Sequence, residues 1–131
     1  MKRILFVFAA ILMMTTVAVS AQEKSAAITV TDSATFDFGD IQEADGDATH
    51  VFTVMNTGEL PLVISRVVAS CGCTTPDWTE EPIAPGKTGE IKVTYGASGR
   101  PGKFAKTVSV YSNGKEGTYV LTIRGNVIKK S

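Results

Sequence analysis

Histidine, tryptophan and cysteine are scarce in this chain of 131 residues, which has one His, one Trp and two Cys. A closed structural zinc site needs four ligands, and two thiols with a single imidazole do not supply them. There is no nucleophile-elbow motif, and no second histidine to act as base for a catalytic serine. We therefore do not expect an enzyme of the hydrolase or transferase type.

A surplus of charge of one sign is missing too. The chain has 13 basic and 13 acidic residues, interspersed along its length. Nucleic acids and anionic lipids are bound by basic patches, and the sequence contains no such patch. We therefore expect no nucleic-acid partner.

Long apolar runs are absent except near the N-terminus, at 4–19. Basic residues at 2–3 precede this run, and small residues at 19–21 end it. This pattern is typical of a secretory signal peptide that is removed by cleavage. We predict a signal peptide at 1–21 and a mature protein that starts at Gln22, is periplasmic or secreted, and is not inserted in a membrane. The alternative is an uncleaved anchor, for which the run is nearly long enough.

The rest of the chain has the size of one domain, and its periodicity is that of β-strands. We expect 22–34 to form an N-terminal lead-in with an edge strand and 35–128 to form the folded domain. The predicted strands are Ile28 to Val30, Thr35 to Phe38, Val51 to Met55, Leu62 to Ala69, Glu90 to Tyr95, Phe104 to Tyr111 and Thr118 to Val127.

Several strands carry further signals. The first two are predicted as edge strands, with Gly39 ending the second, and the continuously apolar Leu62 to Ala69 is typical of a strand covered on both faces. Pro85 in the segment 84–87 predicts a β-turn, and Asn113-Gly114 predicts a hairpin.

About seven short strands predict an all-β fold, an immunoglobulin-like antiparallel β-sandwich. A barrel is the main alternative. Because both cysteines belong to one turn, an antibody-like disulfide between the sheets is excluded. The predicted core is Phe52, Val54, Ile64, Val67, Ile91, Val93, Val108, Val110, Leu121 and Ile123.

Four blocks of sequence carry a resemblance. They read F-D-F-G-D-I, H-V-F-T-V-M-N-T-G-E-L-P-L-V-I, S-C-G-C-T-T-P-D-W and P-I-A-P-G-K-T-G-E-I-K-V-T-Y. Over about 36–127 the chain resembles a secreted bacterial family called domain of unknown function 1573. The resemblance implies an exported immunoglobulin-like sandwich similar to PapD-like and major-sperm-protein-like domains, and it implies no particular reaction.

Cys71 and Cys73 are the first candidate site. Side chains two residues apart on a regular strand are about 6.5 Å apart, whereas a disulfide needs Cβ atoms about 3.5 to 4.5 Å apart, so a bridge requires a bend. Gly72 is expected to permit that bend through backbone angles closed to other residues. An oxidising compartment favours the disulfide, yet a ring of three residues stabilises by only about 1.6 kcal/mol. We predict a disulfide that is easily reduced, and hence a site for dithiol/disulfide exchange.

A metal site is the alternative use of these thiols. Two thiolates suit Cu(I) better than zinc, and His50 is the third candidate ligand, because it opens a strand at the same end of the predicted sandwich as the cysteine turn. The competing interpretation is that His50 is a surface strand residue. No other cofactor is expected.

Trp78 has two interpretations, as a cap on the open end of the core or as an exposed anchor for a partner. Sheet edges are a second route to a partner, and Ile28 to Val30 or Glu90 to Tyr95 are the predicted edges for strand addition. We interpret the chain as an exported, non-enzymatic module for protein interaction or envelope structure, whose partner is an unknown envelope protein or peptide. The alternative is a periplasmic thiol protein that uses Cys71 and Cys73 for Cu(I) binding or redox exchange.

Overall fold

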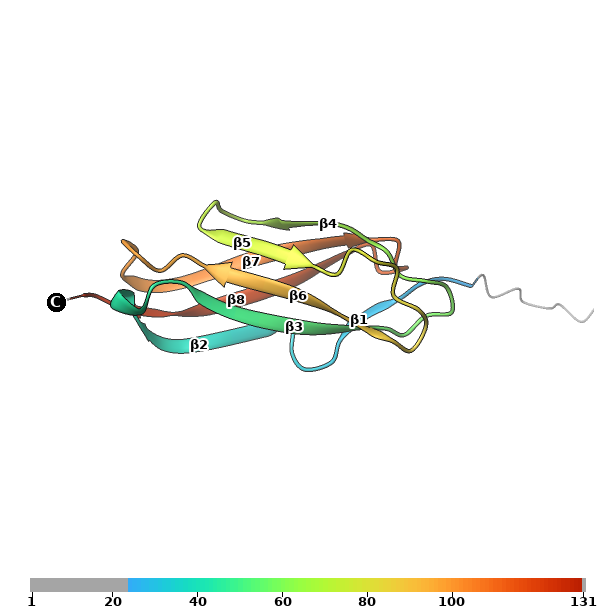
Figure 1. Ribbon diagram of the computed structural model, residues 1–131, viewed down its shortest axis with the longest axis horizontal. Coiled ribbons are helices and arrows are strands. Elements are labelled where there is room, and N and C mark those ends of the chain that lie inside the picture. Colours follow the sequence, from blue (N-terminus) through green and yellow to red (C-terminus); the bar gives the residue numbers. More distant parts are fainter. Residues whose placement is uncertain (1–23, 131) are drawn as a thin grey trace, which may run out of the picture.

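The computed structural model describes residues 24–130, and the predicted signal peptide at 1–21 lies outside them. The described chain folds into eight strands and one short 3-10 turn (Figure 1). These elements are β1 (Ile28–Val30), β2 (Thr35–Gln42), η1 (Glu43–Asp45), β3 (Ala48–Asn56), β4 (Ile64–Ala69), β5 (Thr74–Trp78), β6 (Thr88–Tyr95), β7 (Gly102–Ser112) and β8 (Thr118–Ile128). Within this part of the chain, no helix is long and apolar enough to cross a membrane.

The strands form two four-stranded sheets that pack face to face (Figure 1). The first sheet has the order β1-β3-β6-β5 and the second the order β2-β8-β7-β4. All pairs are antiparallel except β2 with β8, which is parallel. The predicted immunoglobulin-like β-sandwich is confirmed. Its one parallel pair arises because the chain crosses between the sheets after β1 and enters the second sheet alongside β8.

All ten residues predicted for the core are buried, and each is less than 9% exposed. They face one another across the two sheets and are joined by other apolar side chains, among them Leu62, Ile83 and Val127. Burial of each large apolar side chain contributes about 1.5 to 3 kcal/mol before entropy is counted. Ala26 and Ala27, in the predicted lead-in, are also buried, so the core extends to the segment before β1.

Seven strands were predicted, and β5 is the additional one that the sequence did not predict. Pro76 lies at its centre, and proline within a run is a signal against a strand. β5 pairs only with β6, so it lies at the edge of the first sheet, where a missing N–H is tolerated.

Three other strands differ from expectation. β4 is an edge strand with Val68 45% exposed, so it is not covered on both faces. β6 lies between β3 and β5, and the predicted use of Glu90 to Tyr95 as an open edge is therefore wrong. Gly39 does not end β2; it has a φ of 68° within a bulge between Asp37 and Asp40, and the strand continues beyond it.

Both predicted turns are present. Lys87 N donates to Ala84 O at 2.9 Å, and Gly86 has a φ of 78°, as a type II turn requires at its third position. β7 and β8 form the predicted hairpin, but its loop extends to Gly117, whose φ of 75° closes it. The side chain of Asn113 instead binds the segment before β4, at Val63 N and Pro61 O.

Asn56, in the N-T-G block at the end of β3, connects several segments of the chain through its side chain. Its side chain is fully buried. Its Oδ1 accepts hydrogen bonds from Ala27 N at 3.3 Å and Gly58 N at 2.9 Å, while its Nδ2 donates to Leu60 O at 2.7 Å and Ile83 O at 2.8 Å. These four bonds use the whole capacity of a side-chain amide. Asn56 thereby joins the segment before β1 to the loops on either side of β4 and β5.

Gly58 allows those segments to come together. A Cβ atom there would lie 2.6 Å from Ala27 N and 2.7 Å from Ala26 C, both of which are backbone atoms. No side chain fits at such distances, so this position requires glycine.

Candidate functional site

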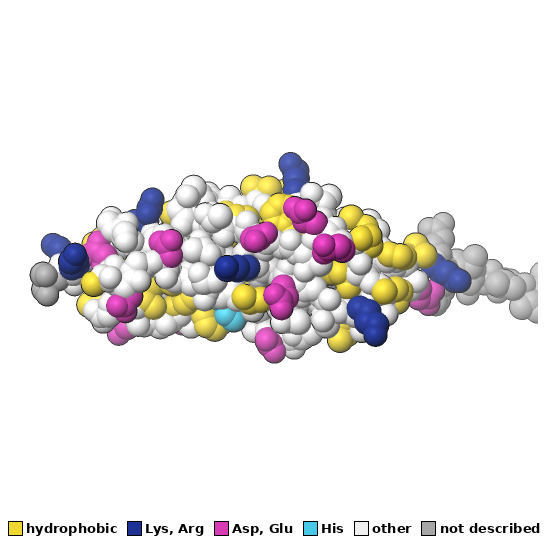
Figure 2. Space-filling model, in the orientation of Figure 1, with side chains coloured by type: hydrophobic (Ala, Val, Ile, Leu, Met, Phe, Trp, Pro, Cys, Tyr) yellow, Lys and Arg dark blue, Asp and Glu magenta, His cyan; other side chains and the backbone are white. Residues whose placement is uncertain are grey.

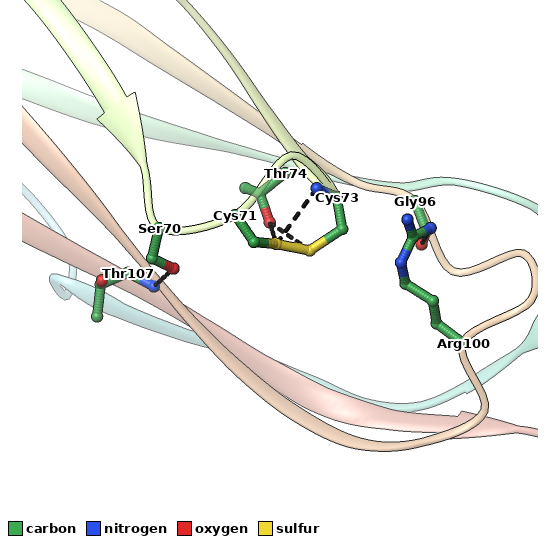
Figure 3. The surroundings of a disulfide bond; sticks show 7 residues. All are labelled: Ser70, Cys71, Cys73, Thr74, Gly96, Arg100 and Thr107. Carbon is green, nitrogen blue, oxygen red and sulfur yellow. Dashed lines mark hydrogen bonds between the residues drawn. A yellow bond between two sulfur atoms is a disulfide. The ribbon is translucent and has the colours of Figure 1, made fainter.

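The cysteine turn connects the two sheets at one edge of the sandwich. Residues 70–73 carry the chain from the end of β4, in the second sheet, to the start of β5, in the first. Ser70 N donates to Thr107 O at 2.9 Å, and Thr107 N donates to Ser70 Oγ at 3.1 Å, which holds the start of the turn against β7 (Figure 3). The other end is held by Gly96 N, which donates to Cys73 O at 2.8 Å.

Cys71 and Cys73 form a disulfide with a Cα–Cα distance of 5.3 Å, within the usual range for this bond (Figure 3). Both residues are half-buried, and Gly72 between them is exposed. Gly72 does not have a φ in the left-handed region, and a Cβ atom there would meet nothing within 4 Å. The expectation that this position needs angles closed to other residues is therefore wrong.

Polar groups lie close to both sulfur atoms. Cys73 N donates to Cys71 Sγ at 3.2 Å. The hydroxyl oxygen of the buried Thr74 lies 3.9 Å from Cys71 Sγ and 3.8 Å from Cys73 Sγ. Arg100 adds an outer contact, because its Nη1 donates to Gly96 O at 2.9 Å and thereby holds the residue that binds Cys73 O. A thiolate at Cys71 would be stabilised by the Cys73 N–H.

His50 lies on the inner side of β3 and is not brought to the cysteines. Its ring stacks on Phe36 of β2, with centroids 3.6 Å apart, and meets Phe52 edge-on at 4.6 Å. His50 pairs in register with Val93 of β6, so a whole strand separates it from the edge strand β5, at whose start the turn lies. Burial lowers the pKa of His50, and the carboxylate of Asp32 acts in the opposite direction.

The three predicted metal ligands do not converge. Across residues 24–130, no group of three or more His, Cys, Asp or Glu side chains is arranged to hold a metal ion. In the disulfide form neither sulfur is a thiolate, so Cu(I) binding at Cys71 and Cys73 requires prior reduction.

Trp78 ends β5 and packs against the core while remaining half-buried. This placement agrees with the interpretation of Trp78 as a cap on the core. A shallow hollow of about 220 Å³ lies beside it, lined by Asp77, Thr79, Glu90 and Lys92.

The edge formed by β5 is closed to further strands. Cys73 O accepts from Gly96 N, directly after β6, and Thr79 N donates to Glu90 O of β6. In the antiparallel alternation, the backbone groups of Thr74, Pro76 and Trp78 therefore point away from β6. Thr74 N donates to Cys71 O at 3.3 Å, and Trp78 N donates to Asp77 Oδ1 at 2.9 Å. Pro76 has no N–H. Every outward donor of β5 is thus occupied or absent, which protects an edge against pairing.

The two outer faces of the sandwich differ in character. Over β3, β6 and β5 the face carries intermixed acidic and basic side chains with scattered apolar ones (Figure 2). Its cross-strand rows include Thr49-Thr94-Thr75 and Val51-Lys92-Asp77, in which Val51 is 39% exposed. On the second sheet, Val68, Ser109 and Val120 form one cross-strand row, in which Val68 is 45% and Val120 48% exposed.

Beside this row, the guanidinium of Arg66 lies 4.2 Å from the centre of the Tyr111 ring. We call these five residues, Arg66, Val68, Ser109, Tyr111 and Val120, the β4 face. The sequence carried a signal for this face that was not used, because Val120 directly precedes the core residue Leu121 and must therefore point to the other side of β8.

Two four-stranded sheets with this arrangement define a PapD-like, immunoglobulin-like β-sandwich. A PapD-like domain of human CEP192 superposes with a TM-score of 0.64 at 8% identity, covering 82% of this chain and 89% of that one. The YadV chaperone gives a TM-score of 0.51 at 14% identity, covering 82% of this chain and 53% of the chaperone.

A protein of unknown function from Porphyromonas gingivalis has a TM-score of 0.67 at 17% identity. It covers 79% of this chain, which spans 47% of its length. At these identities the likeness concerns the fold alone. No curated protein matches the chain. The chain belongs to the family described as proteins of unknown function, DUF1573, which matches residues 16–127.

Proposed function

We propose that this protein is an exported, non-enzymatic β-sandwich module that binds a protein partner in the cell envelope. The observation that carries the proposal is the β4 face. Val68 and Val120 expose nearly half of their surface in one row, whereas on the opposite face the exposed Val51 shares its row with the charged Lys92 and Asp77. Exposed apolar side chains grouped with an aromatic ring and an arginine are typical of protein interaction sites.

Export rests on the N-terminal pattern at 1–21, and the half-buried disulfide is compatible with an oxidising compartment. N-terminal sequencing of the protein recovered from the envelope fraction tests this part, with Gln22 expected as the first residue. A chain that still starts at Met1 would contradict cleavage.

The partner is tested by site-specific photocrosslinking in the organism that encodes the protein. A crosslinker at Val120 is expected to give a discrete adduct, whereas one at Thr94, on the opposite face, gives none and serves as the matched control. Substituting Val68→Asp is expected to remove the Val120 adduct. Equal adducts from both faces, or none from Val120, would count against the proposal.

A second candidate function is dithiol/disulfide exchange at the cysteine turn, and the hydrogen bond from Cys73 N to Cys71 Sγ favours it. A thiolate of an external dithiol would attack Cys73 Sγ, the S–S bond would break, and Cys71 would leave as a stabilised thiolate. The second thiolate of the reductant would then attack the reductant sulfur of this mixed disulfide, forming the disulfide of the reductant and releasing Cys73 as a thiolate, and the two cysteine thiolates would take up the two protons that the reductant has given up. If substituting both cysteines with serine leaves the Val120 adduct unchanged, partner binding does not depend on this chemistry.

A further inference from the structure

We propose that the occupant of the β4 face is an extended peptide segment of the partner protein, which adds to the second sheet as a strand beside β4. This inference rests on the proposed function, since it specifies how the partner binds. It is carried by the backbone groups along the four sheet edges, which differ in how far they are already satisfied.

Strand β4 presents open hydrogen-bonding groups at its outer edge. Ser70 N bonds to β7, so by antiparallel alternation Val68 and Arg66 also face β7, whereas Val67 and Ala69 direct their N–H and C=O groups away from it. Within residues 24–130 these outward groups have no hydrogen-bond partner. They offer an added strand about four backbone hydrogen bonds, two at each residue.

The other three edges are closed or short. β5 has no outward donor left, as described above. β1 has three residues, and its Ile28 N already donates to Glu116 Oε1 at 3.1 Å. Along β2, Thr35 N donates to Ser33 Oγ at 3.1 Å, Gly39 N donates to Asp37 Oδ1 at 2.8 Å, and the bulge interrupts the edge. Side-chain caps and bulges of this kind prevent strand addition.

Just before β4, the same edge of the sheet already pairs with an extended segment of this chain. Leu62 and Ile83 exchange backbone hydrogen bonds of 2.9 and 2.8 Å in an antiparallel bridge. The segment then leaves this edge, because Thr79 N bonds to Glu90 O on β6. β4 has an irregularity of its own, between Ile64 and Arg66, but it lies before the stretch from Val67 to Ala69. Among the described residues, the outward groups of β4 without a partner are therefore confined to that short stretch, where the side chain of Val67 is buried and only its backbone faces the edge.

The side chains beside the edge specify the peptide. A residue opposite Val68 lies on the exposed outer side and is expected to be apolar. Two positions along, a residue opposite Arg66 meets a guanidinium and is expected to carry a carboxylate. We therefore expect apolar and acidic residues two apart in an extended segment.

The open edge is tested first by amide hydrogen exchange in the free protein. The amides of Val67 and Ala69 are expected to exchange at least about ten times faster than those of Arg66 and Val68, which bond to β7. Equal protection at all four amides would overturn the inference.

Binding is tested with the synthetic peptide acetyl-Thr-Val-Thr-Asp-Thr-Val-Thr-amide, followed by exchange and by chemical-shift titration. The peptide is expected to slow exchange at Val67 and Ala69. Among the backbone hydrogen-bonding groups, Ala69→Pro removes only the outward N–H, so it should leave the β4–β7 ladder intact. It should weaken peptide binding at least about tenfold, which corresponds to 1.4 kcal/mol and is comparable to one backbone hydrogen bond. Ala69→Gly keeps the N–H and adds no ring, and it should bind like the parent protein.

The remaining outcomes separate the inference from the proposed function. If the Val120 crosslink captures a partner and Ala69→Pro leaves its yield unchanged, the partner binds the β4 face without strand addition. If both Ala69 variants bind the peptide equally, the edge donor is not used and the inference is wrong. If Ala69→Pro instead abolishes a concentration-dependent dimer, the occupant is a second copy of this chain and not a peptide.

Discussion

The side chain of Asn56 is expected to contribute more to stability than any other single hydrogen-bonding side chain on the described surface or in the core. Asn56→Ala removes the amide and its four hydrogen bonds, although Ile83 O keeps a second bond, from Leu62 N at 2.9 Å. Two of the four bonds, to Ala27 N and from Nδ2 to Ile83 O, are buried, whereas those to Gly58 N and Leu60 O are only partly buried, so water can replace them.

Ala27 N would be left buried and unsatisfied, which costs about 1 to 3 kcal/mol. Ile83 O still accepts from Leu62 N, so losing its bond to Asn56 adds only about 0.5 to 1.5 kcal/mol, and the expected total is about 1.5 to 4.5 kcal/mol. That is a large share of the stability of a domain of this size, which is about 5 to 15 kcal/mol. The melting temperature should fall by at least about 6 °C, since each kcal/mol shifts it by roughly 4 to 8 °C in a domain of about 100 residues.

The measurement is urea unfolding followed by the fluorescence of Trp78, the single tryptophan. Asn113→Ala is the matched control, because Asn113 also binds two backbone groups, Val63 N at 2.8 Å and Pro61 O at 3.0 Å, but at exposed positions. Water can take over both, and a loss below about 1 kcal/mol is expected. If the two variants lose equal stability, burial does not set the cost and the reasoning is refuted.

Three further outcomes are expected. Replacing Cys71 and Cys73 by serine should lower the free energy of unfolding by no more than about 2 kcal/mol, since the closed ring has only three residues; a larger loss in chemical denaturation would show that the bridge stabilises more than chain entropy. Burial lowers the pKa of His50, so the folded protein disfavours the protonated imidazole, and the free energy of unfolding should fall as the pH drops below about 6.5. Unfolding measured between pH 7 and 5 should show this fall in stability, and His50→Phe should flatten it. Gly58→Ala should destabilise by about 1 to 3 kcal/mol through its backbone clash, whereas Gly72→Ala, in open space, should stay within about 0.5 kcal/mol, and the reverse order in thermal melts would contradict the geometry.

The cysteine turn shows where sequence reasoning about the site reached its limit. Spacing alone excluded a bridge between distant strands and predicted the disulfide as one option. Strand order places His50 and the cysteine turn near the same end of the sandwich, but it does not say which strands lie at the edges of the sheets. The register through β6 puts the imidazole against Phe36 instead, because β2 pairs with β8 and brings its aromatic residues over the start of β3.

The open edge of β4 had no counterpart in the sequence. Whether a strand is central or at an edge depends on which strands pair with it, and that is a long-range property. Leu62 to Ala69 has the apolar composition of a covered strand, and Glu90 to Tyr95 has the alternation of a half-exposed one, yet their positions in the sheets are the reverse of those expectations. Pro76 is the local mark of an edge that was available, since proline is confined to such positions within sheets.

Composition and alternation by themselves determined that this chain forms a β-sandwich and which side chains fill it, because a period of two fixes the inward face of each strand whatever its neighbours are. Only the tertiary structure decided which strands are neighbours, that β2 runs parallel to β8, and that Asn56 joins the segment before β1 to the loops before β4 and before β6. These strand pairings depend on contacts between residues far apart in the chain. They leave β4 at the edge of its sheet, and the backbone groups of Val67 and Ala69 are without partners for that reason.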